Sequence, residues 1–219
     1  MNIAIRVDAS NIIGTGHVMR CLTLAQILRQ YGHNISFSMR PQQNDFIQFV
    51  TGKGFLIKQL PTPQTWEKPI ISNEYKAWLQ CTEYEDAVDF IEKNQHTDLV
   101  IVDHYGLSLT WELAVKKQLD CDIFAIDDLQ RIHHCDFLLD ATLNRTRDDY
   151  AAKVPRTCKI LTGCEYALLN PNFALARKKL VSSSVIKNHK ILITMGGIDN
   201  TNITLTILIA LSSFSTRHP

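Results

Sequence analysis

The sequence predicts an α/β protein whose parallel sheet is covered by helices on both faces. Short runs of β-branched and apolar residues alternate along the chain with longer segments that carry apolar residues at helical spacing. Polar, glycine-containing segments directly follow two of these runs, at residues 8–17 and 103–106. Because the carboxyl ends of parallel strands meet at one edge of a sheet, we expect a ligand site at that edge.

The beginning of the chain has the pattern of one βαβ unit. Residues 2–7 predict a strand, and the spacing of apolar residues over 18–28 predicts a helix. Gly32 is expected to end this helix in the C′ position, after which residues 34–39 predict a second strand. The same alternation predicts helices over 45–50, 83–92 and 109–119, and strands over 55–60, 99–102, 123–126, 137–139 and 160–161.

Two stretches interrupt this alternation. Residues 61–73 contain three prolines and little periodicity, so we expect a long surface excursion or a lid there. Three consecutive serines begin at Ser182, after a predicted helix over 172–180, and indicate a linker over 182–189. Residues 1–181 are therefore predicted to form the first domain.

Residues 190–219 predict only the start of a second α/β domain. A strand is expected over 190–194, followed by a glycine turn and a helix over 203–214. One strand and one helix cannot enclose a core, and the apolar stripe of the helix would remain open to water. We therefore expect this second domain to be incomplete, so that the chain is a fragment or a truncated gene product.

Composition and charge exclude several classes of protein. A hydrophobic content of 45% is typical of a globular protein with a buried core. The net charge of +1 and the scattered Lys and Arg residues do not indicate a nucleic-acid-binding surface. No apolar run reaches membrane-spanning length, and the charges of Arg6 and Asp8 exclude a signal peptide, so we expect a cytoplasmic protein.

The cysteine and histidine pattern does not indicate a metal site. The six cysteines include no C-x-x-C pair, which is typical of a reduced compartment. Residues 133–136, His-His-Cys-Asp, have the side chains of metal sites, but adjacent residues point in different directions and no second cluster has ligand spacing. We therefore expect neither a metal nor another cofactor.

His17 follows two closely spaced glycines, Gly14 and Gly16, in the first strand-to-helix loop. Met19 stands where a dinucleotide fingerprint has a small residue, and no G-K-S/T element indicates a P-loop. Because the positive end of a helix disfavours an imidazolium, we expect His17 to be neutral and able to act as a general base. A structural role, in which His17 hydrogen-bonds the loop, remains the alternative.

Charged residues at strand ends complete the predicted site. Arg6 and Asp8 share one face of the first strand, where a buried charge must be paired. We expect Arg6 to support the loop, and Asp8 either to support it or to contact the ligand. Residues 103–106 end another buried strand and should lie beside the first loop. Asp127 and Asp128 should point to opposite faces, so at most one of them lies in the site and the other caps a loop or helix.

A set of motifs runs in order along the whole chain. It comprises Arg6-x-Asp8-x-Ser10, Ile13-Gly14-x-Gly16-His17-x-x-Arg20-Cys21, Asp103-His104-Tyr105-Gly106, Asp127-Asp128, Gly163-x-x-Tyr166-Ala167-Leu168 and Met195-Gly196-Gly197-x-Asp199. In these motifs the chain resembles the UDP-sugar hydrolases of the pseudaminic acid pathway. The resemblance implies a two-domain GT-B fold with a Rossmann-type parallel sheet, similar to the UDP-N-acetylglucosamine transferase that makes lipid II.

The resemblance also implies a reaction. Members of that family remove UDP from UDP-2,4-diacetamido-2,4,6-trideoxy-β-L-altropyranose, cleaving the anomeric C–O bond with inversion and without a metal. It gives His17 the role of catalytic base, and it gives Tyr105 the role of positioning the sugar or the water. Further substrate contacts are assigned to Asp8, Gly14, Gly16, Arg20, Asp103, His104 and Asp128, and nucleotide or diphosphate contacts to Gly196, Gly197, Asp199 and Asn200.

The partners that follow from this resemblance are the UDP-sugar and water. In the family the second domain carries most of the uracil and ribose contacts, and here only its first strand, turn and helix are expected. We expect a monomer, with neither nucleic acid nor a membrane as a partner. Two alternatives remain open: a glycosyltransferase of the same fold, whose base deprotonates an acceptor hydroxyl, and a truncated module without enzymatic activity.

Overall fold

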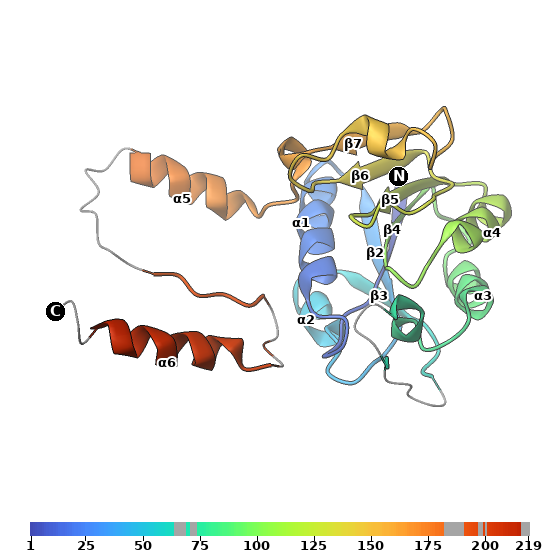
Figure 1. The fold of residues 1–219 in the computed structure, drawn as a ribbon. Helices are drawn as coiled ribbons and strands as arrows, with labels where there is room; N and C mark the ends of the chain where they lie inside the picture. Colours follow the sequence, from blue (N-terminus) through green and yellow to red (C-terminus); the bar gives the residue numbers. More distant parts are fainter. Residues whose placement is uncertain (64–68, 71–73, 182–190, 197–198, 200, 216–219) are drawn as a thin grey trace.

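Within the described residues the strands form one seven-stranded, wholly parallel sheet in the order β3-β2-β1-β4-β5-β6-β7. A computed structural model describes residues 1–63, 69–70, 74–181, 191–196, 199 and 201–215 (Figure 1). The strands are β1 Asn2–Val7, β2 Asn34–Met39, β3 Leu56–Gln59, β4 Leu99–Asp103, β5 Asp122–Ile126, β6 Phe137–Asp140 and β7 Lys159–Thr162. The predicted parallel α/β sheet is confirmed.

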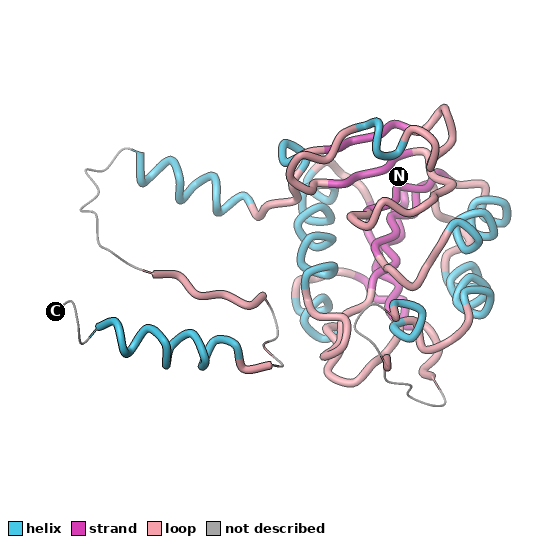
Figure 2. Tube along the Cα trace, viewed as in Figure 1, coloured by secondary structure: helices cyan, strands magenta, loops and turns pink. Residues whose placement is uncertain are grey.

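Helices cover both faces of this sheet, as Figure 2 shows. Val18 and Val50, from α1 and α2, pack with Ile5 on one face, whereas Phe90 and Trp111, from α3 and α4, belong to the core of the other face. The α-helices are α1 Gly16–Gln30, α2 Ile47–Gly52, α3 Glu83–Lys93, α4 Leu109–Leu119, α5 Pro171–Val181 and α6 Ile203–Ser215. The 3-10 turns are η1 Tyr75–Trp78, η2 Arg147–Tyr150 and η3 Cys164–Tyr166.

The order of the strands creates a switch point between β1 and β4. The chain builds outward from β1 to β2 and β3, then crosses back so that β4 pairs with β1 on its other side. Val7, the last residue of β1, lies in register with Asp103, the last residue of β4. The loops that follow these two strands therefore leave the same edge of the sheet side by side, which is where ligands bind in such folds.

Two predicted elements differ from the structure. The short helix expected over 45–50 begins at Ile47, because the Asp45 carboxylate accepts hydrogen bonds from the backbone N–H groups of Gln42 and Ile47 and makes a turn first. The strand expected over 190–194 is wrong for the described residues 191–194, which pair with no strand. A strand needs a neighbour for its backbone hydrogen bonds, and among the described residues this segment has none.

Helices α5 and α6 lie outside the layers of the sheet (Figure 1). Both occur where the sequence predicts them, and apolar side chains on them are exposed, including Phe173 and Leu208. The predicted linker, 182–189, lies outside the described residues, so the division into domains stays a prediction. No helix in the described part of the chain is long and apolar enough to cross a membrane.

Candidate functional site

A tight loop between β1 and α1 sets the position of His17. Gly14 has a φ of 82°, in the left-handed region, and its N–H donates to the Ser10 carbonyl oxygen at 2.8 Å. The Ser10 hydroxyl accepts hydrogen bonds from the N–H groups of Ile12 and Ile13, at 3.2 Å each. The loop is thus closed by its own residues, and α1 starts at Gly16. His17 therefore stands in the first turn of the helix, at the carboxyl edge of the sheet.

Asp103 fixes the orientation of the His17 ring. Nδ1 of His17 lies 2.6 Å from Oδ1 of Asp103, whose side chain is fully buried. Burial alone would raise the pKa of Asp103, but the interactions with His17 and Arg20 outweigh it and hold that pKa below its usual range. An ionised carboxylate only accepts hydrogen bonds, so this contact assigns a proton to Nδ1, and Nη2 of Arg20, 3.2 Å from Nδ1, donates to Asp103 instead. With its one proton on Nδ1, a neutral imidazole keeps a lone pair on Nε2. In the described part of the chain, nothing hydrogen-bonds Nε2 of His17.

Arg20 joins Asp103 to Asp128. Its Nε and Nη2 atoms each donate to an oxygen of Asp103 at 2.6 Å, in a bidentate pair, and its Nη1 donates to Oδ2 of Asp128 at 3.2 Å. The hydroxyl of Tyr105 donates to the other oxygen of Asp128. Burial and this carboxylate raise the pKa of Tyr105, so its hydroxyl remains protonated at neutral pH. The structure thus brings together five predicted site residues: His17, Arg20, Asp103, Tyr105 and Asp128.

An aromatic wall that the sequence did not predict stands beside His17. Trp78 stacks on Tyr105 with ring centroids 5.5 Å apart, and Tyr75 contacts both rings edge to face at 4.9 Å. His17 in turn meets Tyr105 edge to face at 4.6 Å. Tyr75 and Trp78 lie just past residues 61–73, the stretch predicted as a surface excursion or a lid. The cluster of aromatic residues there, Tyr-Lys-Ala-Trp-Leu, was the available signal.

Asp8 and His104 are buried residues that directly follow β1 and β4. Asp8 is 1% exposed, and its Oδ1 accepts the Arg40 N–H at 2.8 Å and pairs with Arg6 at 2.7 Å. His104 is 2% exposed, its Nδ1 accepts the Gly106 N–H, and its Nε2 lies 3.4 Å from Asp8. Burial lowers the pKa of His104. The geometry shows both residues supporting the two loops, and their predicted contact with substrate stays untested.

Arg6 is paired, as a charge inside a central strand requires. Its Nε and Nη2 atoms contact the two oxygens of Asp86 at 3.0 Å and 2.7 Å. Asp86, which comes from α3, also accepts hydrogen bonds from Arg40 at 2.9 Å and from the Trp111 indole at 3.1 Å. This cluster fastens α3 to the strand that leads into the His17 loop. No sequence pattern identified Asp86 as the partner of Arg6.

The two adjacent aspartates after β5 have different surroundings, as expected. Asp128 belongs to the site, with its side chain 30% exposed. Asp127 is buried and accepts hydrogen bonds from the backbone and the guanidinium of Arg131 and from the Tyr150 hydroxyl. Asp127 therefore closes the loop after β5, and Asp128 remains available to a ligand.

The residues predicted to bind diphosphate are described only in part. Gly196 has a φ of 77°, and Gly197 and Asn200 lie outside the described residues. The carboxylate of Asp199 accepts hydrogen bonds from the N–H groups of Ile203 and Thr204, at 2.9 Å and 2.8 Å, and so caps α6. The N–H groups of Ile203 and Thr204 are thus already bonded to Asp199, and diphosphate binding by the turn at residues 196–200 stays a prediction.

His133 is held by carboxylates. Nδ1 of His133 lies 2.6 Å from Glu112 and Nε2 lies 3.4 Å from Asp127. Burial disfavours the charged ring, but the two carboxylates outweigh it and raise the pKa of His133 to about 9. Among the described residues, no group of three or more His, Cys, Asp and Glu side chains is arranged to hold a metal ion. All six cysteines are free thiols.

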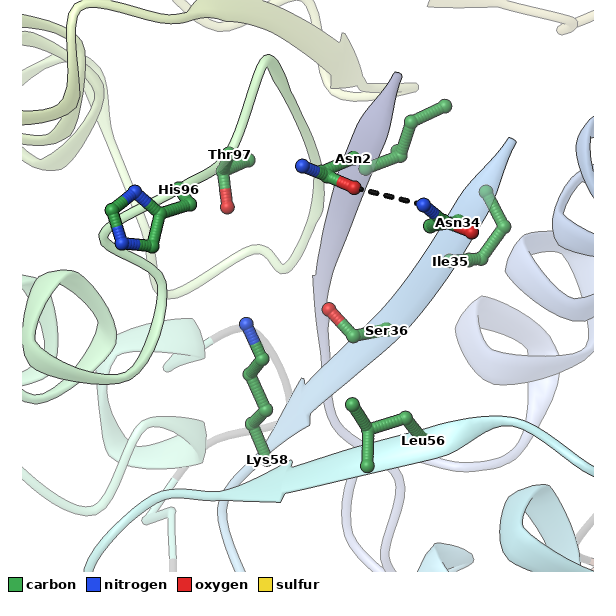
Figure 3. Close-up of a pocket in the computed structure, with 9 residues that line it drawn as sticks. Asn2, Asn34, Ile35, Ser36, Leu56, Lys58, His96 and Thr97 are labelled. Atoms are coloured by element: carbon green, nitrogen blue, oxygen red, sulfur yellow. Dashed lines mark hydrogen bonds between the residues drawn. The ribbon is translucent and has the colours of Figure 1, made fainter.

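A cavity of about 260 Å³ lies at the opposite edge of the sheet. Figure 3 shows the residues that line it. Asn2 and Asn34, which line it, are the first residues of β1 and β2, and Lys58 reaches into it from β3. The amino ends of parallel strands are not where such sheets bind their substrates. The expected place for a ligand is therefore the edge of the sheet that carries His17.

Comparisons with known proteins agree with the resemblance. The chain is 31% identical over 207 residues to the UDP-2,4-diacetamido-2,4,6-trideoxy-beta-L-altropyranose hydrolase of Campylobacter jejuni, covering 94% of this chain and 64% of that protein. It is 27% identical over 215 residues to the uncharacterized protein MJ1062 of Methanocaldococcus jannaschii, covering 95% of this chain and 39% of that protein. The chain thus spans less than two thirds of the length of either relative. No family model matches it.

A solved structure is also similar. The crystal structure of Acinetobacter baumannii MurG aligns with a TM-score of 0.46 at 15% sequence identity. The alignment covers 74% of this chain and 45% of the MurG chain.

Proposed function

We propose that this chain hydrolyses a UDP-linked amino sugar, UDP-2,4-diacetamido-2,4,6-trideoxy-β-L-altropyranose, to UDP and the free sugar with inversion. The observation that carries the proposal is the 2.6 Å contact of His17 with Asp103, which leaves Nε2 as a base at the carboxyl edge of the sheet. The similarity to the Campylobacter hydrolase supports the choice of substrate. The reaction would belong to pseudaminic acid synthesis in the cytoplasm.

The chemistry is a single displacement. A water molecule gives one proton to Nε2 of His17 while its oxygen forms a bond to the anomeric carbon. The bond from that carbon to the UDP oxygen breaks, and its electron pair leaves on the diphosphate. Since the water attacks from the side opposite UDP, the configuration inverts. UDP needs no general acid because it leaves as a weakly basic anion, so one base suffices.

Asp103 and Arg20 prepare His17 for this step. The Asp103 carboxylate holds the proton on Nδ1 and stabilises the imidazolium that forms when Nε2 takes a proton. Arg20 binds both oxygens of Asp103 and keeps that carboxylate ionised. The Arg20 side chain is 26% exposed, so it can also meet an anionic or polar part of the substrate.

Tyr105 and Asp128 are placed to bind the sugar or the water. The Tyr105 hydroxyl donates its only proton to Asp128, so its oxygen lone pairs remain available to accept a hydrogen bond from a ligand. We assign the loop glycines, Gly14 and Gly16, to close approach of the substrate, and the turn at residues 196–200 to the diphosphate. Adding a Cβ at Gly14 or Gly16 would meet no atom within 4 Å, so the space beside both is open.

The test is incubation of the purified chain with the UDP-sugar. We expect UDP and free sugar in equal amounts, and we expect His17→Ala to lower kcat by at least about 10²-fold, the usual contribution of a general base. His96→Ala is the matched control, because His96 lies at the opposite edge of the sheet. An unchanged rate in His17→Ala would overturn the mechanism.

Isotope labelling and product analysis test the bond that breaks. In ¹⁸O-labelled water the label is expected in the sugar and not in UDP, because water attacks carbon. The first product seen by proton NMR should have the inverted anomeric configuration. Label in UDP would contradict C–O cleavage, and release of UDP that depends on an added acceptor alcohol would indicate a transferase instead.

A further inference from the structure

The η1 turn supplies one wall of the His17 site. Trp78 stacks on Tyr105 with an angle of 24° between the ring planes, and its ring lies edge to face with His17 at 6.2 Å. Tyr75 makes edge-to-face contacts with both Trp78 and Tyr105. Three aromatic rings and the imidazole therefore form one continuous cluster, and Trp78 touches both residues proposed to act on the substrate.

This turn is anchored in place. The side chain of Gln42, itself 7% exposed, donates to the Trp78 carbonyl oxygen at 2.9 Å. Leu79, the next residue, is 1% exposed and belongs to the core. At the start of the turn, the Tyr75 carbonyl oxygen lies close to Gly106. A Cβ added at Gly106 would lie 2.7 Å from this oxygen. The aromatic wall is thus part of the packed structure.

The stack restricts the Tyr105 ring. The hydroxyl of Tyr105 donates to Asp128, and the guanidinium carbon of Arg131 lies 5.6 Å from the ring centroid, so several contacts position the ring and the stack with Trp78 is one of them. A stacked or edge-to-face aromatic contact stabilises a pair of rings beyond the burial of their apolar area. Trp78 supplies such a contact to the Tyr105 ring, and Tyr105 makes its own edge contact with His17.

We propose that Trp78 is a positioning residue of this site, whose indole holds Tyr105 edge-on to His17. The expected effect of Trp78 on kcat rests on the proposed hydrolysis. Its expected effect on the positions of the Tyr105 and His17 rings does not. Small displacements of a positioned group are costly, since about 1 Å of misplacement lowers a rate by about 10²-fold. Loss of the indole should therefore lower kcat more than it changes KM.

The experiment compares Trp78→Leu with Trp78→Phe. We expect kcat for UDP release to fall by about 10- to 100-fold in Trp78→Leu, with KM within about threefold, and to be largely restored in Trp78→Phe, which keeps a flat ring. Tyr84→Leu is the matched control, because Tyr84 is an exposed aromatic residue near the start of α3. A kcat in Trp78→Leu within twofold of wild type would overturn the proposal.

Two further measurements test the role of Trp78 separately from the proposed hydrolysis of the UDP-sugar. The NMR resonances of the His17 ring should move in Trp78→Leu and stay in place in Tyr84→Leu, whether or not the chain hydrolyses the UDP-sugar. Unmoved His17 resonances in a folded Trp78→Leu variant contradict the proposal. In a Tyr105→Ala background, Trp78→Leu should have almost no further effect on kcat. An undiminished effect there would show that Trp78 does not act through Tyr105.

Discussion

Nδ1 of His17 and Oδ1 of Asp103 lie 2.6 Å apart although 86 residues separate them in the sequence. His17 comes from the first turn of α1 and Asp103 from the last position of β4. The pairing of β1 with β4, with Val7 in register with Asp103, brings the two together. The structure therefore supplies the carboxylate that a histidine base needs.

Asp103→Asn should impair catalysis without unfolding the chain. An asparagine amide can donate to Nδ1 of His17, which moves the ring proton to Nε2 and removes the base. We expect kcat to fall by about 10²- to 10⁴-fold. Nitrogen NMR of the His17 ring should show the proton on Nε2, and Asp122→Asn, at the exposed start of β5, should leave kcat unchanged. A ring proton that stays on Nδ1 would contradict this account.

Gly106→Ala should displace the aromatic turn. The new Cβ would lie 2.7 Å from the Tyr75 carbonyl oxygen, which is closer than real contacts allow, and 3.0 Å from the His104 ring. We expect a loss of about 1–3 kcal/mol in the free energy of unfolding, measured by urea denaturation. Gly52→Ala is the control, since a Cβ there meets nothing within 4 Å and the change should stay within about 1 kcal/mol. Equal effects of the two substitutions would refute the packing argument.

Arg6→Leu should be strongly destabilising. It leaves the carboxylates of Asp8 and Asp86 buried without their shared cation, and breaking a buried ion pair in this way costs about 3–5 kcal/mol. The free energy of unfolding in urea measures the loss. Lys93→Ala removes an exposed ion pair with Glu92 and should change stability by less than about 1 kcal/mol. An Arg6→Leu variant as stable as Lys93→Ala would be inconsistent with this charge cluster.

His133 should make stability fall at alkaline pH. Its pKa is raised from 6.5 to about 9 in the folded chain, so the protonated ring favours folding. That contribution is complete below pH 6.5 and is lost as the pH rises through about 9. Its size is on the order of 3 kcal/mol, from the difference between the two pKa values.

Two variants isolate this effect of His133. In His133→Gln the decline in the free energy of unfolding between pH 6.5 and 9 should be flatter than in wild type, because the titrating ring is gone. His134→Gln, a change at the adjacent residue, should keep the wild-type slope. Parallel pH profiles for wild type and His133→Gln would show that the ring does not carry the dependence.

Most of the fold could be predicted from local patterns. Residues 2–7, 34–39 and 109–119 form the predicted elements with unchanged bounds, because alternating or helical spacing of apolar residues is a property of neighbours in the sequence. The same reasoning placed two polar loops at one sheet edge. It failed over 191–194, where a strand-like sequence has no neighbour to pair with among the described residues.

The sequence by itself determined that this protein is a parallel α/β sheet with a histidine in its first loop. Only the tertiary structure decided which side chains meet there: Asp103 orients His17, Trp78 stacks on Tyr105, and Asp86 from α3 neutralises Arg6. The physical reason is that periodicity sets the conformation of each segment, whereas these contacts depend on strand order and helix packing, which join residues far apart in the chain.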